Sequence, residues 1–149
     1  MLNVNRRILI SAPHDSVRRY LSDLNQIAYY EPKVDSIEVS ASGVAEATGR
    51  FFGLPWSASF QFEFGRDGGY RGVMISGPLK SMECRIALRP VNGGTLLDHD
   101  EEYDLPFFLW PLRSLVRRWL EHALETELDH IKEGAEALDR RLQLQVLGA

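Results

Sequence analysis

Cysteine is almost missing from this sequence of 149 residues, which contains only Cys84. A single cysteine excludes an internal disulfide framework and a cysteine-rich zinc site, and it suits a reducing compartment. We expect Cys84 to be a small buried hydrophobe and not a nucleophile. No segment approaches the roughly 18 apolar residues of a membrane span, and the N-terminal apolar run is too short for a signal peptide. We therefore predict a cytoplasmic protein with no stable membrane insertion.

An excess of positive charge is also absent, because the formal net charge is -4. This balance provides no general basic surface for phosphate backbones, so we expect no nucleic-acid partner. The sequence has no GxSxG, HExxH or glycine-rich phosphate-binding motif, and we predict neither a cofactor nor a metal ion. Apolar material is plentiful: 44% hydrophobic and 26% charged residues predict one globular domain over residues 1–149.

The spacing of apolar residues changes twice along the chain. A strand is predicted at residues 4–11, and Pro13 suits the first turn of a following helix. Apolar residues then recur at helical spacing, at Val17, Tyr20, Leu21 and Leu24. A short helical turn in "NQIAYYEPKV" is expected to end at Pro32.

A second pattern begins at Val34, where the apolar period becomes two. It predicts strands at residues 34–41, 44–52, 56–66, 69–77, 79–89 and 95–105. The turn signals "ASG", "GLP", "RDGG", "SGP" and "NGG" separate them, and such short connections make neighbouring strands antiparallel. After Pro111 the helical period returns and predicts one long helix over residues 112–142. Gly134 is expected to weaken that helix by up to about 1 kcal/mol relative to alanine.

The last predicted strand raises a question about burial. Its alternation puts His99, Glu101 and Tyr103 on one face with Leu97 and Leu105. The other face is almost wholly acidic and is expected to face water, so the histidine and the glutamate point inwards, where unpaired polar groups are costly. These residues are either the polar groups of an otherwise apolar pocket, or a satisfied histidine near the sheet rim with a glutamate that reaches solvent or an arginine.

The segment "HDEEYD" also contains a histidine among carboxylates, which are metal ligands in many proteins. Alternation, however, sends Asp98, Asp100 and Glu102 away from His99. A metal site built from this segment alone is therefore not expected.

Several strands carry large apolar side chains on one face. In "WSASFQFEF" that face holds Trp56, Ala58, Phe60, Phe62 and Phe64. Later strands add Met74, Cys84 and Ile86. These side chains either form a packed core or line a pocket, and an inward aromatic residue is ordinarily part of a core.

The order of elements is one strand, two short helices, six antiparallel strands and a long C-terminal helix. This order resembles the START-like, or SRPBCC, superfamily with its helix-grip fold. The resembling residues are "ILISAPHDSVRRYLSDLNQIAYYEPKVDSIEV", "GGTLLDHDEEYDLP" and the amphipathic helix from about residue 112 to 142. The resemblance implies an α+β fold in which a curved antiparallel sheet of about seven strands wraps around the long helix and leaves a mostly apolar cavity. It also implies ligand binding, since polyketide cyclases, lipid carriers and ubiquinone-binding proteins are among the relatives.

We therefore expect a binding or carrier protein for a hydrophobic small molecule such as a lipid, polyketide or quinone. The alternative is an enzyme of the polyketide cyclase or dehydratase type that uses His99 and Glu101 as acid and base. The predicted ligand-binding residues are Tyr30, Phe60, Phe62, Phe64, Met74, Cys84, Ile86, His99, Glu101, Tyr103, Phe107, Trp110, Val116 and Trp119.

Two segments have the composition expected of a pocket entrance, "AYYEP" and "LPFFLWPL". We expect Phe107, Phe108 and Trp110 of the second segment to cover the ligand. The alternative is that these rings form a dimer contact, because an exposed apolar patch often marks an interface. The sequence leaves open a monomer or a homodimer.

Overall fold

The computed structural model describes residues 1–51 and 53–148. Its strands are β1 Leu2–Ile10, β2 Val34–Val39, β3 Val44–Phe51, β4 Leu54–Phe64, β5 Tyr70–Ser76, β6 Ser81–Val91 and β7 Gly94–Asp104. Its helices are α1 His14–Ser22, η1 Leu24–Gln26, α2 Ile27–Tyr30, η2 Phe107–Leu112 and α3 Arg113–Leu147, where η marks a 3-10 helix. Every predicted strand is present with slightly shifted ends. The predicted end of the third strand at residue 52 lies outside the described residues.

The seven strands form one antiparallel sheet in the order β1-β7-β6-β5-β4-β3-β2. Tight turns produce this meander. In the turn between β6 and β7, Gly93 has a φ of 87°, a conformation that a residue without Cβ adopts at little cost. β1 departs from sequential order by pairing with β7, with Leu2 opposite Tyr103 and Ile10 opposite Thr95. The two edges of the sheet are therefore β1 and β2.

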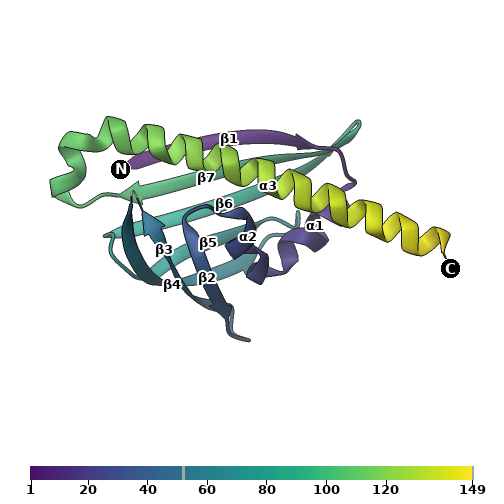
Figure 1. The fold of residues 1–149 in the computed structure, drawn as a ribbon, viewed down its shortest axis with the longest axis horizontal. Helices are drawn as coiled ribbons and strands as arrows, with labels where there is room; N and C mark the ends of the chain where they lie inside the picture. The colour runs from purple at the N-terminus through teal and green to yellow at the C-terminus, as the bar shows by residue number, and fades with distance from the viewer. Residues whose placement is uncertain (52, 149) are drawn as a thin grey trace.

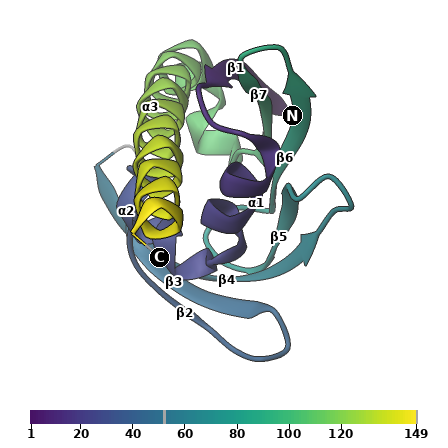
Figure 2. The ribbon, with the colours of Figure 1, turned by 90° about the vertical axis from the view of Figure 1, so that its right-hand side faces the viewer.

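The sheet curves around α3, and α1 lies beside that helix within the same curve (Figures 1 and 2). α3 has 35 residues and runs five residues past the predicted end at residue 142. The side chains that it buries lie three or four positions apart, as one face of a helix requires: Val116, Leu120, Leu124, Leu128, Ile131 and Ala135. The predicted helix-grip architecture is confirmed. Among the described residues, no helix is long and apolar enough to cross a membrane.

Gly134 allows α1 and α3 to lie close together. A Cβ built at this position would overlap the ring of Tyr20, which comes from α1. Gly134 therefore has a packing role in addition to the predicted weakening of the helix. Helical spacing does not reveal this role.

The alternation predicted for β7 is confirmed. His99 and Glu101 are each 1% exposed, and Tyr103 is buried beside them. Asp100 and Glu102 lie on the opposite face and are exposed. The covered face of the sheet thus contains polar groups from β7, which is the second strand in spatial order. These groups are on the side of the sheet that faces α3.

Candidate ligand-binding site

Five buried ionisable side chains gather between the sheet and α3. Glu31 and Lys33 follow α2, His99 and Glu101 come from β7, and Glu127 comes from α3. Glu127 lies one turn from Leu124 and Ile131, so helix geometry directs it toward the sheet with that apolar face. Charged residues are rarely buried to this degree unless they are paired.

Lys33 links two of the carboxylates. Its Nζ lies 2.9 Å from Oε1 of Glu31 and 3.5 Å from Oε2 of Glu101. The backbone N–H of Lys33 also donates to Oε1 of Glu31 at 3.0 Å. Burial opposes the charge on Lys33, but the carboxylates of Glu101 and Glu31 outweigh it and hold the pKa of Lys33 well above its usual value. Lys33 and these two carboxylates therefore form a charged unit inside the protein.

His99 and Glu127 form a second pair with different electrostatics. Nδ1 of His99 lies 3.3 Å from Oε2 of Glu127. Burial lowers the pKa of His99 to about 4, whereas burial and the charges of Glu31 and Glu101 raise the pKa of Glu127 well above its usual value. The imidazole of His99 is therefore uncharged near neutral pH, and burial favours the protonated form of the Glu127 carboxyl group.

Polar atoms of this cluster lack partners. Among the described residues, no hydrogen bond reaches Nδ1 or Nε2 of His99, Oε1 of Glu101, the hydroxyl of Tyr103 or Oε2 of Glu127. The His99 and Glu127 atoms are close, but they do not meet hydrogen-bond geometry. A buried polar group without a partner costs about 1–3 kcal/mol. Such groups in a native protein commonly mark a place where another molecule binds.

Two small spaces adjoin these atoms, each with a volume of about 50 Å³. The inner space reaches His99, Glu101 and Glu127. The outer space is lined mainly by apolar side chains from β3, β4, β5 and the connection between β5 and β6, among them Phe51, Trp56, Ala58, Met74, Pro78 and Leu79. Phe60 and Met82 border both spaces. Together the two spaces make a mostly apolar cavity; its inner space also touches Glu31, His99, Glu101 and Glu127, and its outer space also touches Lys33 and Tyr103.

Many residues predicted to bind ligand border this cavity. The outer space touches Phe60, Met74 and Tyr103, and the inner space touches Phe60, Phe62, Cys84, His99 and Glu101. Burial and the nearby Glu101 and Glu127 carboxylates raise the pKa of Cys84, which agrees with its expected role as an inert thiol.

Other predicted residues take part in packing. Tyr30 is buried, and its hydroxyl lies 2.8 Å from the hydroxyl of Tyr70. Ile86 and Val116 belong to the hydrophobic core and border neither space. The ring of Trp119 packs against Phe51, with centroids 5.4 Å apart.

Three predicted residues are exposed and border neither space. Phe64 is the last residue of β4 and is 52% exposed. Phe107 is 84% exposed and Trp110 is 38% exposed, and both lie in η2. None of residues 105–112 borders either space. The described residues at the outer end of the cavity instead include Pro78 and Leu79, between β5 and β6.

The sequence reasoning missed Glu31, Lys33 and Glu127. The sequence pattern could have indicated Glu127, because it is a charged residue within the apolar face of a predicted helix. Glu31 and Lys33 lie in an irregular segment beside Pro32, where no periodicity indicates burial.

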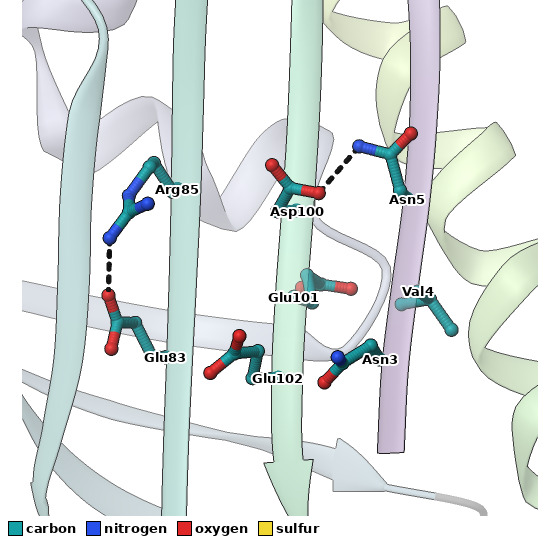
Figure 3. Close-up of a pocket in the computed structure, with 8 residues that line it drawn as sticks. All are labelled: Asn3, Val4, Asn5, Glu83, Arg85, Asp100, Glu101 and Glu102. Atoms are coloured by element: carbon teal, nitrogen blue, oxygen red, sulfur yellow. Dashed lines mark hydrogen bonds and ion pairs between the residues drawn. The ribbon is translucent and has the colours of Figure 1, made fainter. Parts of the chain in front are cut away.

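A separate hollow of about 370 Å³ lies on the opposite face of the sheet, over β1, β7 and β6 (Figure 3). Its polar groups pair with one another. Asn5 donates to Asp100 at 2.6 Å, and Arg85 donates to Glu83 at 3.1 Å. Because these groups already have partners, this hollow is a weaker candidate than the cavity between the sheet and α3.

Comparisons with solved structures support the fold. A protein from Thermus thermophilus is 23% identical, with a TM-score of 0.80, and the match covers 91% of this chain and 98% of that one. The Zhui aromatase/cyclase from Streptomyces is 15% identical, with a TM-score of 0.73 and coverage of 91% and 93%. A START superfamily protein from Mycobacterium smegmatis is 15% identical, with a TM-score of 0.68 and coverage of 94% and 98%.

Sequence comparison identifies the family. No curated protein matched the chain. The family described as polyketide cyclase / dehydrase and lipid transport matches residues 1–136, which is most of the sequence. The chain therefore belongs to this family and to the START-like, or SRPBCC, superfamily that its fold resembles.

Proposed function

We propose that this protein binds a hydrophobic small molecule that carries at least one polar group, such as a lipid, polyketide or quinone. One observation carries the proposal: side chains with partnerless polar atoms line a mostly apolar cavity, with His99, Glu101 and Glu127 at the inner space and Tyr103 at the outer space. The apolar part of the ligand would occupy the outer space beside Phe60 and Met74. A carbonyl or hydroxyl group would reach His99, Tyr103 and Glu127.

The chemistry of the inner end suits such a group. The hydroxyl of Tyr103 and the protonated carboxyl group of Glu127 can each donate a hydrogen bond to a ligand oxygen. The neutral imidazole of His99 can donate from one nitrogen and accept at the other. A ligand oxygen would thus satisfy groups that otherwise stay unpaired, which favours polar-tipped hydrophobic molecules over plain hydrocarbons. The family description, which includes lipid transport, supports a carrier role.

The size of the cavity implies movement. Each space has about 50 Å³, whereas ligand pockets commonly have about 300–1,000 Å³. A ligand with several rings must therefore displace side chains on entry. We infer that the segment containing Pro78 and Leu79 moves outward, because it borders the outer space and lies in a connection between strands. We place this activity in a single domain and in a reducing compartment, in keeping with the lone Cys84.

The test is binding of an environment-sensitive apolar dye, together with native mass spectrometry of the purified protein to identify any retained molecule. Ala58 borders the outer space, so Ala58→Trp should fill it and weaken dye binding about tenfold or more. The matched control is Ala87→Trp, which places the same ring on the exposed face of the sheet and should leave dye affinity unchanged. If both variants are folded by circular dichroism and bind the dye with equal affinity, the cavity is not the dye-binding site and the proposal is wrong.

A second candidate function is acid–base catalysis of the cyclase or dehydratase type. The observation that favours it is the His99–Glu127 pair, in which a neutral base lies 3.3 Å from a protonated acid. The pair differs from the His99–Glu101 pair expected from the sequence, because Glu101 is occupied by Lys33. His99→Gln should abolish turnover of a polyketide substrate while it retains binding of that substrate. Turnover that survives the substitution would leave only the carrier role.

A further inference from the structure

His99, Glu101 and Glu127 together form an arrangement suited to a metal ion. One ligand atom from each lies within 4.8 Å of the other two, and all three residues are buried. Two come from β7 and the third comes from α3. The sequence predicts no metal site from this segment, because the acidic neighbours of His99 along β7 point to the other face.

The distances are close to those of a coordination sphere. Nδ1 of His99 and Oε2 of Glu127 are 3.3 Å apart. Two ligands bound to one tetrahedral ion at about 2.0–2.2 Å are about 3.4 Å apart. The ligand atom of Glu101 lies within 4.8 Å of the other two, and Oε1 of Glu101 has no hydrogen-bond partner among the described residues, whereas Lys33 contacts the other oxygen.

Charge provides an independent argument. A metal ion displaces the proton of Glu127 when it binds, so that Glu31, Glu101 and Glu127 then contribute three negative charges and Lys33 contributes one positive charge. A divalent cation between His99 and the two carboxylates brings this buried group to neutrality. Low-dielectric surroundings penalise net charge strongly, so a dication is favoured over a monovalent ion or an anion.

The partnerless atoms point to the same ligand. Both ring nitrogens of His99 and one oxygen each of Glu101 and Glu127 have no hydrogen-bond partner among the described residues, and all three side chains are at least 98% buried. The adjoining space of about 50 Å³ is large enough for an ion and a water molecule.

We propose that His99, Glu101 and Glu127 bind one divalent transition-metal cation, with Zn²⁺ the best match. One nitrogen and two carboxylate oxygens suit Zn²⁺, which accepts three protein ligands and leaves a fourth position open. Mg²⁺ and Ca²⁺ prefer oxygen ligands in larger number, so an imidazole site of this size selects against them. The open position would face the cavity. Metal binding itself requires no organic ligand and is therefore tested separately from the proposed function.

The experiment uses the full chain, free of any affinity tag and stripped with a chelator. Zn²⁺ is titrated against a competing chromophoric chelator, and one ion per chain is expected. Glu127→Gln keeps the shape of the side chain but removes the anionic ligand, so affinity should fall about tenfold or more. Glu133→Gln is the matched control, because Glu133 lies on the exposed side of the same helix, and its affinity should equal that of the wild type.

A second measurement does not depend on variants. Long-range ¹H–¹⁵N spectra of the wild-type imidazoles should show a shift for His99 on addition of one equivalent of Zn²⁺, with His122 and His130 unchanged. Three results would each overturn the proposal: no stoichiometric Zn²⁺ binding, undiminished binding by folded Glu127→Gln, or a shift confined to the surface histidines. In each of those cases the three side chains would hold no metal ion, and the proposed binding of a hydrophobic ligand would be unaffected.

Discussion

Substitution of Gly134 by alanine tests the close packing of α1 on α3. In a helix interior, alanine is more favourable than glycine by about 1 kcal/mol. Here the added Cβ would overlap the hydroxyl group, Cζ and Cε1 of Tyr20. Overpacking of this kind costs about 1–3 kcal/mol, so it outweighs the gain in helix propensity. The ring of Tyr20 also packs on Tyr30 with centroids 6.0 Å apart, and displacing it would weaken that contact. We expect Gly134→Ala to lower the free energy of unfolding by up to about 2 kcal/mol.

The sign of the effect should reverse when the obstacle is removed. In a Tyr20→Ala background the Cβ has room, and Gly134→Ala should stabilise the protein by about 1 kcal/mol. Urea unfolding followed by circular dichroism gives the four free energies of the double-mutant cycle, and unchanged slopes with urea confirm a common reference state. Stabilisation by the same amount in both backgrounds would show that Tyr20 does not limit the approach of the two helices.

Three further outcomes follow from the site. Lys33→Met leaves the Glu31 and Glu101 carboxylates without their cation. In urea titrations it should lower the free energy of unfolding by about 3 kcal/mol or more, and a loss under about 1 kcal/mol would contradict the buried charged unit. In the metal-free protein, burial lowers the pKa of His99 to about 4. The free energy of unfolding is therefore unaffected by this group above about pH 6.5, and it falls by about 3 kcal/mol as the pH falls toward 4. His99→Gln should flatten that part of the stability profile, and an unchanged profile would assign the acid sensitivity to other groups. Phe107→Ser should change the free energy of unfolding by less than about 0.5 kcal/mol and leave dye affinity unchanged. Lost dye binding would indicate that the cavity entrance lies at η2, as expected from the sequence.

Local patterns were sufficient to predict the strands and helices, whereas their arrangement, with the sheet curved around the long helix, was implied by the family resemblance. Two-residue alternation and turn signals identified all seven strands, and three- and four-residue spacing identified α3. Alternation also predicted that His99, Glu101 and Tyr103 share the covered face of β7, because neighbouring side chains of a strand must point to opposite sides.

Features that depend on distant segments were not predictable in the same way. Alternation says to which side Phe64 points, but not that its ring is about half exposed in the folded protein. Helical spacing shows a glycine at position 134, but not the tyrosine ring from α1 that lies against it. Likewise, no spacing rule connects Lys33 to Glu101, because the two residues meet only after the sheet has curved.

The pairing of β1 with β7 has a consequence for synthesis of the protein on the ribosome. The first strand emerges early, yet its hydrogen-bonding partner in β7, Thr95 to Tyr103, is translated only after the five strands in between, β2 to β6. At about 5–20 residues per second, the nascent β1 waits on the order of ten seconds with one apolar face and both edges uncovered. During that interval, neighbouring nascent chains on the same messenger present equivalent strands to one another. Chaperones that shield the first dozen residues should therefore raise the yield of folded protein more than those that act after release.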